Sequence, residues 1–160
     1  MLWMCACLFA SGQDIVVYGA TPAGVAAALQ AKRMGKTVTL LEPSGHIGGL
    51  TASGLGWTDS GDKAVVGGIS REFYRNIRKH YQKPESWTFE KREDYRLFRE
   101  GEDAMWTFEP KVAEMVMFSM LRAEGIEPRL GQRLVRSKGM GVEKQDGRIV
   151  SIRLEGGERV

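Results

Sequence analysis

The stretch DIVVYGATPAGVAAALQAKRMGKTVTLLE, residues 14–42, decides the fold. Its β-branched start predicts a buried strand over 14–18, and this strand runs directly into a glycine turn at 19–24. The residues after the turn favour a helix, which a proline opens and a glycine closes. A further apolar run at 36–41 predicts the next strand and leads into an acidic residue. This order predicts one βαβ unit with parallel strands.

The turn has the composition of a phosphate-binding loop. Gly19 permits a sharp bend, Gly24 allows close packing of helix against strand, and the helix N-terminus offers N–H groups to a pyrophosphate. Glu42, after the second strand, can accept hydrogen bonds from a ribose diol, and no arginine follows it to bind a 2′-phosphate. Thr21 stands where the G-x-G-x-x-G pattern has its second glycine, so a βαβ unit without a phosphate ligand is an alternative at this point.

A paired glycine follows within EPSGHIGGLT, residues 42–51. Strand, glycine turn, helix, strand, acidic residue and Gly-Gly loop together resemble the FAD-dependent oxidoreductases of the glutathione-reductase-like fold, which are flavoproteins with two dinucleotide-binding domains. The segment YGATPAGVAAA at 18–28 looks most like the exported FAD-dependent oxidoreductases of bacteria, and WTFEPKVAE at 106–114 is similar to a segment of the same group. The resemblance covers most of residues 14–160.

The resemblance implies an α/β fold, a Rossmann-like FAD/NAD(P)-binding domain with a parallel sheet and an antiparallel β-meander. Residues 13–160 would form the N-terminal, incomplete part of that domain, with an inserted helical segment at about 57–108. The implied cofactor is FAD, and the implied activity is transfer of a hydride or electron pair between FAD and a small substrate. The residues that the resemblance places at the FAD are Gly19, Ala20, Thr21, Pro22, Ala23 and Gly24 at the pyrophosphate, Glu42 at the adenosine ribose, and Gly48 and Gly49 along the diphosphate.

Three alternatives stay open beside this interpretation. An NAD-binding dehydrogenase module uses the same motif, although the Gly48-Gly49 pair favours FAD, and a non-catalytic nucleotide-binding remnant would keep the same fold. The glycine-rich segment 45–56 is also compatible with a flexible surface loop. The sequence identifies no catalytic residue, since it contains no Ser/His/Asp or Cys/His arrangement, but in a flavoenzyme the isoalloxazine carries the redox chemistry.

The remaining elements are expected downstream of the glycine pair. Helices are predicted at 67–79 and 109–124, the first with an apolar face and the second with methionines that fill the core. Gly67 and Gly68 are candidates either for close packing near the flavin ring or for a helix cap, and Trp87, Trp106 and the aromatic residues between them are expected in core or cap packing. Strands are predicted at 126–130, 132–136, 142–145 and 149–154, with a hairpin turn at Asp146-Gly147.

Composition excludes several other classes of protein. The chain has 160 residues, of which 42% are hydrophobic and 27% charged, as in a soluble globular domain. The formal net charge is +3, with both signs interspersed, and the basic, aromatic stretch 71–99 reads as a solvated helix face, so no nucleic-acid partner is expected. His46 and His80 lie far apart, so no metal site is indicated.

The N-terminus predicts export. Residues 1–12 combine a short apolar run with small residues before Gln13, as in a signal peptide cleaved after Gly12. The run is too short for a permanent membrane span, and it lacks a basic start, so a plain apolar terminus is the alternative. Both cysteines, Cys5 and Cys7, lie inside this segment, which excludes a disulfide framework in the exported protein.

Overall fold

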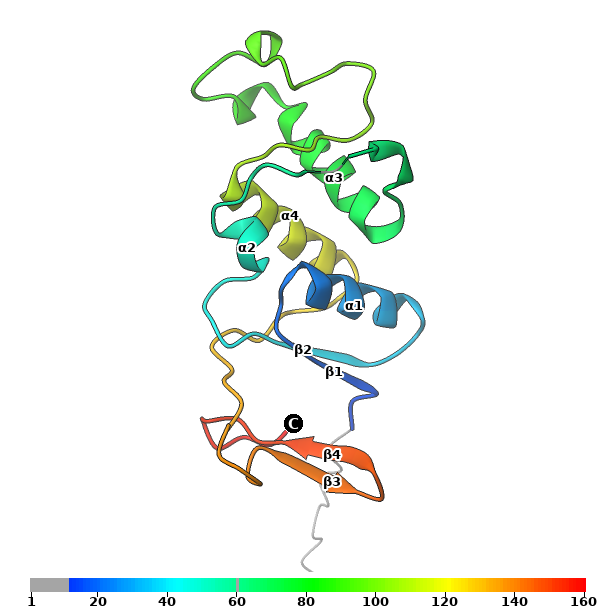
Figure 1. Ribbon diagram of the computed structural model, residues 1–160, viewed down its shortest axis with the longest axis vertical. Helices are drawn as coiled ribbons and strands as arrows, with labels where there is room; N and C mark the ends of the chain where they lie inside the picture. Colours follow the sequence, from blue (N-terminus) through cyan, green and yellow to red (C-terminus); the bar gives the residue numbers. More distant parts are fainter. Residues whose placement is uncertain (1–11, 60) are drawn as a thin grey trace, which may run out of the picture.

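The computed structural model describes residues 12–59 and 61–160 (Figure 1). The signal peptide predicted for residues 1–12 therefore lies, apart from Gly12, outside the described residues and stays a prediction. Figure 1 shows three zones along the long axis: an irregular segment after α3 at one end, a strand-and-helix layer in the middle, and a β-hairpin at the other end. In the described part of the chain, no helix is both long and apolar enough to cross a membrane.

The predicted βαβ unit is present. Strand β1 (Ile15–Tyr18) leads through the glycine turn into helix α1 (Pro22–Arg33), and strand β2 (Val38–Leu41) follows. The two strands pair in parallel, with a register that runs from Ile15↔Val38 to Tyr18↔Leu41. The start and stop signals act as predicted, because Pro22 occupies the first turn of α1 and Gly35 adopts a φ of +77° just beyond its end.

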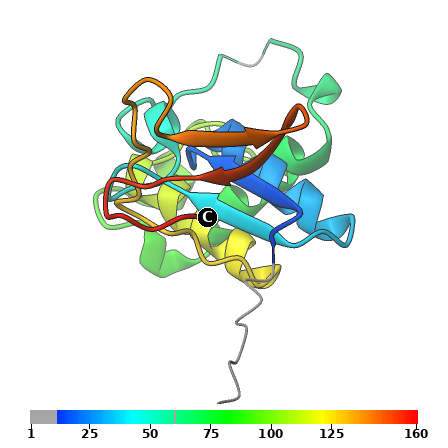
Figure 2. The same ribbon diagram turned by 90° about the horizontal axis from the view of Figure 1, so that it is seen from below.

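Strand β1 is less buried than its composition predicts. Ile15, Val16 and Tyr18 are between 36% and 44% exposed, whereas Val17 packs against the core. The prediction of a buried strand was wrong for a physical reason: among the described strands β1 pairs only with β2, and helices cover one face of this pair. Figures 1 and 2 place the hairpin on the opposite face.

Three further helices follow, and the two long ones complete the core. Helix α2 (Gly49–Ala52) turns part of the expected surface loop into a short helix, and α3 (Gly68–Tyr81) and α4 (Pro110–Ala123) match the predicted helices. The residues that the two long helices bury are apolar, with Arg78 as the exception; they are Phe73, Ile77 and Tyr81 on α3 and Val112, Ala113, Val116, Met117, Met120 and Leu121 on α4. Met115 is 46% exposed, so the prediction that the α4 methionines fill the core was wrong for this one.

The C-terminal meander is shorter than predicted. The expected strand 126–130 pairs with β2 at a single bridge, Leu41↔Arg129, and 132–136 pairs at Leu134↔Leu154. The prediction of two regular strands was wrong, since each segment makes a single bridge among the described residues and Gly131, with a φ of +68°, turns the backbone between them. The expected hairpin is present as β3 (Val142–Gln145) and β4 (Arg148–Ile152), which pair antiparallel.

The segment between α3 and α4 is mostly irregular. It contains 3-10 turns at Pro84–Ser86 and Arg92–Asp94, and a further 3-10 turn, Lys63–Val65, precedes α3. Trp87 anchors the segment to the end of α3 by donating from its indole Nε1 to the Tyr81 carbonyl at 2.7 Å. The buried Arg78 guanidinium lies 4.3 Å from the centroid of the Phe98 ring. These contacts hold the irregular segment against α3.

Candidate functional site

The glycine turn after β1 requires glycine for two different reasons. Gly19 adopts a φ of +101°, a conformation that L side chains rarely adopt. A Cβ atom at Gly24 would lie 1.9 Å from the Gly19 carbonyl oxygen, which no side chain tolerates. The close packing that the sequence predicts at Gly24 is therefore a backbone-to-backbone approach at the start of α1.

Thr21, the departure from the G-x-G-x-x-G pattern, caps the helix. Its backbone is extended, and its Oγ1 accepts a hydrogen bond from the Gly24 N–H at 3.3 Å. Thr21, Pro22 and Ala23 are exposed, so the first turn of α1 is open to a ligand. The threonine side chain is thereby directed toward the helix backbone by its own hydrogen bond.

Glu42 is buried and tied to the turn. Its Oε2 accepts from the Ala20 N–H at 2.7 Å, and its Oε1 accepts from the Ser44 N–H at 2.9 Å. A carboxylate has lone pairs for more acceptor bonds than these two, so Glu42 retains capacity for a ligand hydroxyl. The sequence indicates the ribose role; it does not reveal that the same carboxylate holds the turn.

The second glycine segment lies against the first. The Gly48 N–H donates to the Ala20 carbonyl at 2.7 Å, and a Cβ at Gly49 would lie 3.5 Å from the Thr21 Cγ2. Gly48 and Gly49 have φ values of +92° and +48°, so both occupy the left-handed region. The two segments, far apart in the chain, thus form one backbone-lined surface.

Glu114 on α4 also positions this loop. Its Oε1 accepts from the Ile47 N–H at 3.0 Å and lies 3.2 Å from the Nδ1 of His46. Sequence reasoning missed this residue, although it ends the WTFEPKVAE segment that carries part of the resemblance. Gly67 and Gly68 lie at the start of α3 as its N-cap and first residue, with a φ of +57° at Gly68, which agrees with the capping interpretation.

These residues fit an FAD dinucleotide. The turn and the Gly-Gly loop present backbone with little side chain, as close approach to a pyrophosphate requires, and the α1 N-terminus carries the positive end of the helix dipole. Among residues 12–59 and 61–160, no group of three or more His, Cys, Asp and Glu side chains has the arrangement of a metal site.

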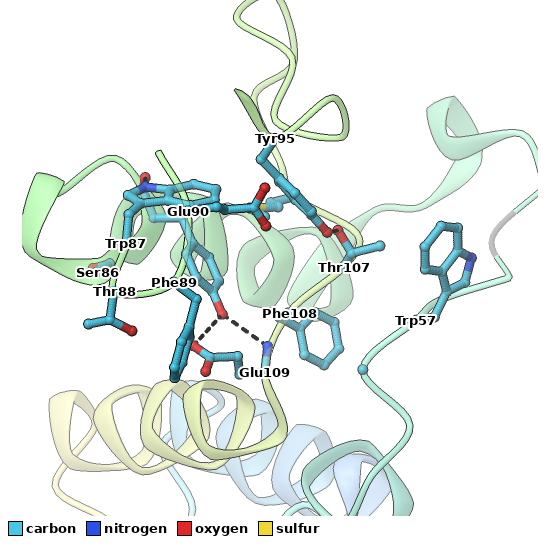
Figure 3. Close-up of a pocket in the computed structure, with 13 residues that line it drawn as sticks. Trp57, Ser86, Trp87, Thr88, Phe89, Glu90, Tyr95, Thr107, Phe108 and Glu109 are labelled. Atoms are coloured by element: carbon cyan, nitrogen blue, oxygen red, sulfur yellow. Dashed lines mark hydrogen bonds between the residues drawn. The ribbon is translucent and has the colours of Figure 1, made fainter. Parts of the chain in front are cut away.

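A separate pocket of about 430 Å³ lies beside the irregular segment between α3 and α4 (Figure 3). None of its lining residues belongs to the glycine turn, to Glu42 or to the Gly48-Gly49 pair. The sequence predicts core or cap packing for Trp87, Phe89 and Tyr95, which line this pocket, and it does not predict the pocket itself. The lining residues are Gly56, Trp57, Tyr81, Ser86, Trp87, Thr88, Phe89, Glu90, Tyr95, Met105, Thr107, Phe108 and Glu109.

A reciprocal pair of hydrogen bonds shapes the floor of this pocket. The Tyr81 hydroxyl accepts from the Glu109 N–H at 2.9 Å and donates to the Glu109 Oε2 at 3.2 Å, the dashed lines to Glu109 in Figure 3. Burial raises the pKa of Tyr81 to about 12, so the phenol is neutral at physiological pH. The Tyr95 Oη and the Thr107 Oγ1 lie 2.9 Å apart on the neighbouring wall.

Comparison with known proteins gives the following findings. The family model described as FAD dependent oxidoreductase matches residues 14–160. No curated protein matches the chain significantly. Solved structures also match over most of the chain. One is the 3-ketosteroid-Δ4-(5α)-dehydrogenase of Rhodococcus jostii RHA1, with 18% identity and a TM-score of 0.52, and the match covers 98% of this chain and 44% of that chain. Another is a deletion form of the L-amino acid deaminase of Proteus vulgaris, with 17% identity and a TM-score of 0.54, and the match covers 91% of this chain and 50% of that chain. At these identities the structural likeness shows the fold, and the chain spans half or less of each of these two proteins.

Proposed function

Because this chain belongs to the FAD-dependent oxidoreductase family, we propose that it forms the FAD-binding portion of an enzyme that transfers a hydride or electron pair between a small molecule and FAD. The observation that carries the proposal is the meeting of the two glycine segments. The hydrogen bond from the Gly48 N–H to the Ala20 carbonyl joins them at the exposed N-terminus of α1.

The residues of the joined segments have distinct roles in this proposal. Thr21 at the N-cap and Pro22 and Ala23 in the first turn of α1 lie at the pyrophosphate, where N–H groups and the helix dipole favour negative charge. Gly19, Ala20 and Gly24 shape that turn, and Gly48 and Gly49 lie along the diphosphate. Glu42 accepts from the adenosine ribose while it keeps its bonds to the turn.

When bound, the isoalloxazine of FAD supplies the redox chemistry. The described residues of this chain bind the nucleotide half of the cofactor and orient it through backbone contacts. The NAD-binding module is the competing function, and the Gly48-Gly49 segment against the turn is the feature that favours FAD over it.

The test is the identity of the nucleotide that copurifies with the full-length protein. We expect a yellow protein that releases FAD, identified by mass spectrometry of the supernatant after denaturation. Release of NAD or FMN, or no nucleotide after incubation with FAD, would contradict the proposal. A colourless protein that binds NAD would establish the dehydrogenase module instead.

A further inference from the structure

The pocket beside the irregular segment has the properties of a small-molecule site. Its volume of about 430 Å³ falls within the range of roughly 300–1,000 Å³ that is typical of ligand pockets. It is lined by residues from three parts of the chain, at 56–57, 81–95 and 105–109. Its walls are mostly apolar, with a few polar groups, and hydrogen bonds from Trp87 and Tyr81 hold them in place.

Aromatic rings form the apolar walls. Tyr81 and Trp87 have ring centroids 5.4 Å apart, and Trp87 and Tyr95 have centroids 5.5 Å apart. Trp57 and Phe89 also line the pocket and are 62% and 92% exposed, so most of their surface is open to contact. Aromatic faces carry negative partial charge, and they attract flat rings and cations.

The charged groups that line the pocket are acidic. Among the described residues, 13 line the pocket; Glu90 and Glu109 are the two carboxylates among them, and they include neither lysine nor arginine. Lys111 pairs with Glu109 at 3.0 Å but is not part of the lining, and its side chain is mostly exposed. This charge pattern disfavours a carboxylate or phosphate ligand and favours a cation.

We propose that this pocket binds a protonated organic amine that carries a flat ring. The ring lies among the side chains of Trp87, Phe89 and Tyr95, and the ammonium group lies near the carboxylates of Glu90 and Glu109, which Figure 3 shows on the same pocket. The proposal concerns binding, and it stands independently of the reaction at FAD.

The test compares three probes of similar shape by calorimetry on the full-length, FAD-saturated protein: benzylamine, benzyl alcohol and benzoate. We expect benzylamine to bind about tenfold or more tightly than benzyl alcohol, because it adds charge-assisted hydrogen bonds, and benzoate to bind more weakly than either. Benzoate that binds as tightly as benzylamine would overturn the proposal. So would benzylamine binding that is present in the FAD-free protein and lost on saturation with FAD, because the pocket would then hold the isoalloxazine.

Variants test the contribution of the carboxylates to binding separately from that of the aromatic ring. The double variant Glu90→Gln with Glu109→Gln should remove the preference for benzylamine over benzyl alcohol, and glutamine at 109 keeps an oxygen for the Tyr81 hydroxyl. Phe89→Ala should weaken binding of both probes, and circular dichroism checks that this variant, which truncates an exposed side chain, is folded. Glu93→Gln, outside the pocket lining, is the matched control and should change neither affinity.

The outcome separates this proposal from the proposed function. A yellow, FAD-loaded protein that fails to bind benzylamine would overturn the pocket assignment alone. A colourless protein that binds benzylamine with the expected preference would overturn FAD binding and leave the pocket assignment standing. Unchanged benzylamine affinity in the double glutamine variant and in Phe89→Ala would also overturn the pocket assignment.

Discussion

A single hydrogen atom at Gly24 decides whether α1 can approach β1. Any larger substituent would meet the Gly19 carbonyl, because even a Cβ would lie 1.9 Å from that oxygen. Glu42 depends on the same geometry, since its carboxylate reaches the Ala20 N–H only while the turn keeps its shape. Thus the residues of a motif associated with cofactor binding also stabilise the fold of the turn.

The first prediction concerns Gly24→Ala. We expect a loss of about 1–3 kcal/mol in the free energy of unfolding, because backbone must move to admit the methyl group, and weaker FAD binding because the turn moves with it. Urea unfolding and FAD titration of the full-length protein measure the two effects. Gly45→Ala is the matched control, since a Cβ there meets nothing within 4 Å and its φ is not positive. Equal unfolding midpoints for the two variants would contradict the steric argument.

At the scale of elements, one arginine joins three helices. Arg33, the last residue of α1, donates from Nη1 and Nη2 to the carboxylate of Glu72 on α3 at 2.8 and 2.9 Å. Its Nε donates at 2.7 Å to Glu124, the C-cap residue of α4. The side chains are partly exposed, so solvent screens the pairs, but the fork geometry fixes the relative placement of the helices.

The pH dependence of this junction can be predicted. The hydrogen bonds from Arg33 hold the pKa of Glu72 below its usual 4.5, so the ionised form is favoured in the folded state. The resulting stability is therefore fully present above pH 4.5, and it is lost as the pH falls from 4.5 through the lower folded-state pKa. We expect Glu72→Gln to cost less than about 1 kcal/mol at pH 7, as for other exposed pairs.

Urea unfolding of the wild type and of Glu72→Gln at pH 7 and at steps below pH 4.5 measures this effect. The difference in the free energy of unfolding between the two proteins should become smaller as the pH is lowered. Glu127→Gln, on an exposed pair with Arg122, is the control for removing a surface carboxylate. A difference that stays constant down to the acid limit of the native state would show that Glu72 contributes through packing and not through its charge.

At the scale of the whole molecule, the zones differ in how firmly they are packed. Helices α1, α3 and α4 share one apolar core, whereas β3 is exposed along its whole length and β4 along most of it. The Tyr18 hydroxyl of β1 accepts from the Leu134 N–H at 3.0 Å and is one link between the sheet and the meander. Figures 1 and 2 show the hairpin lying beyond the sheet, away from the helices.

We therefore expect amide hydrogen exchange to be faster in the hairpin than in the helices of the core. Residues 142–152 should exchange through local opening, and the amides of α1 and α4 should exchange only when the core opens, because local stability follows apolar burial. Mass spectrometry of peptides from the full-length protein measures both rates. Tyr18→Phe, which removes the acceptor for the Leu134 N–H, should speed exchange at Leu134 and leave α4 unchanged. Equal protection of the hairpin and α4 would contradict this division.

What the sequence by itself determined are the features that depend on neighbours in the chain. The parallel unit from β1 to β2 follows from a β-branched run, a proline at the helix start and a glycine after its end. The β3–β4 hairpin follows from Asp146-Gly147, whose φ values of +51° and +79° are those that this dipeptide adopts readily. Such signals act over a few residues, so they can be read without knowing where the rest of the chain lies.

Only the tertiary structure decided what depends on contacts between distant residues. It set the exposure of β1 and reduced the strands predicted at 126–136 to bridges, because a strand's burial and length depend on the partners it finds. It placed Gly48 against Ala20 and Glu114 beneath Ile47, contacts that no local pattern specifies. It also opened a pocket among aromatic side chains whose composition alone indicates a core, since composition cannot tell a filled space from an empty one.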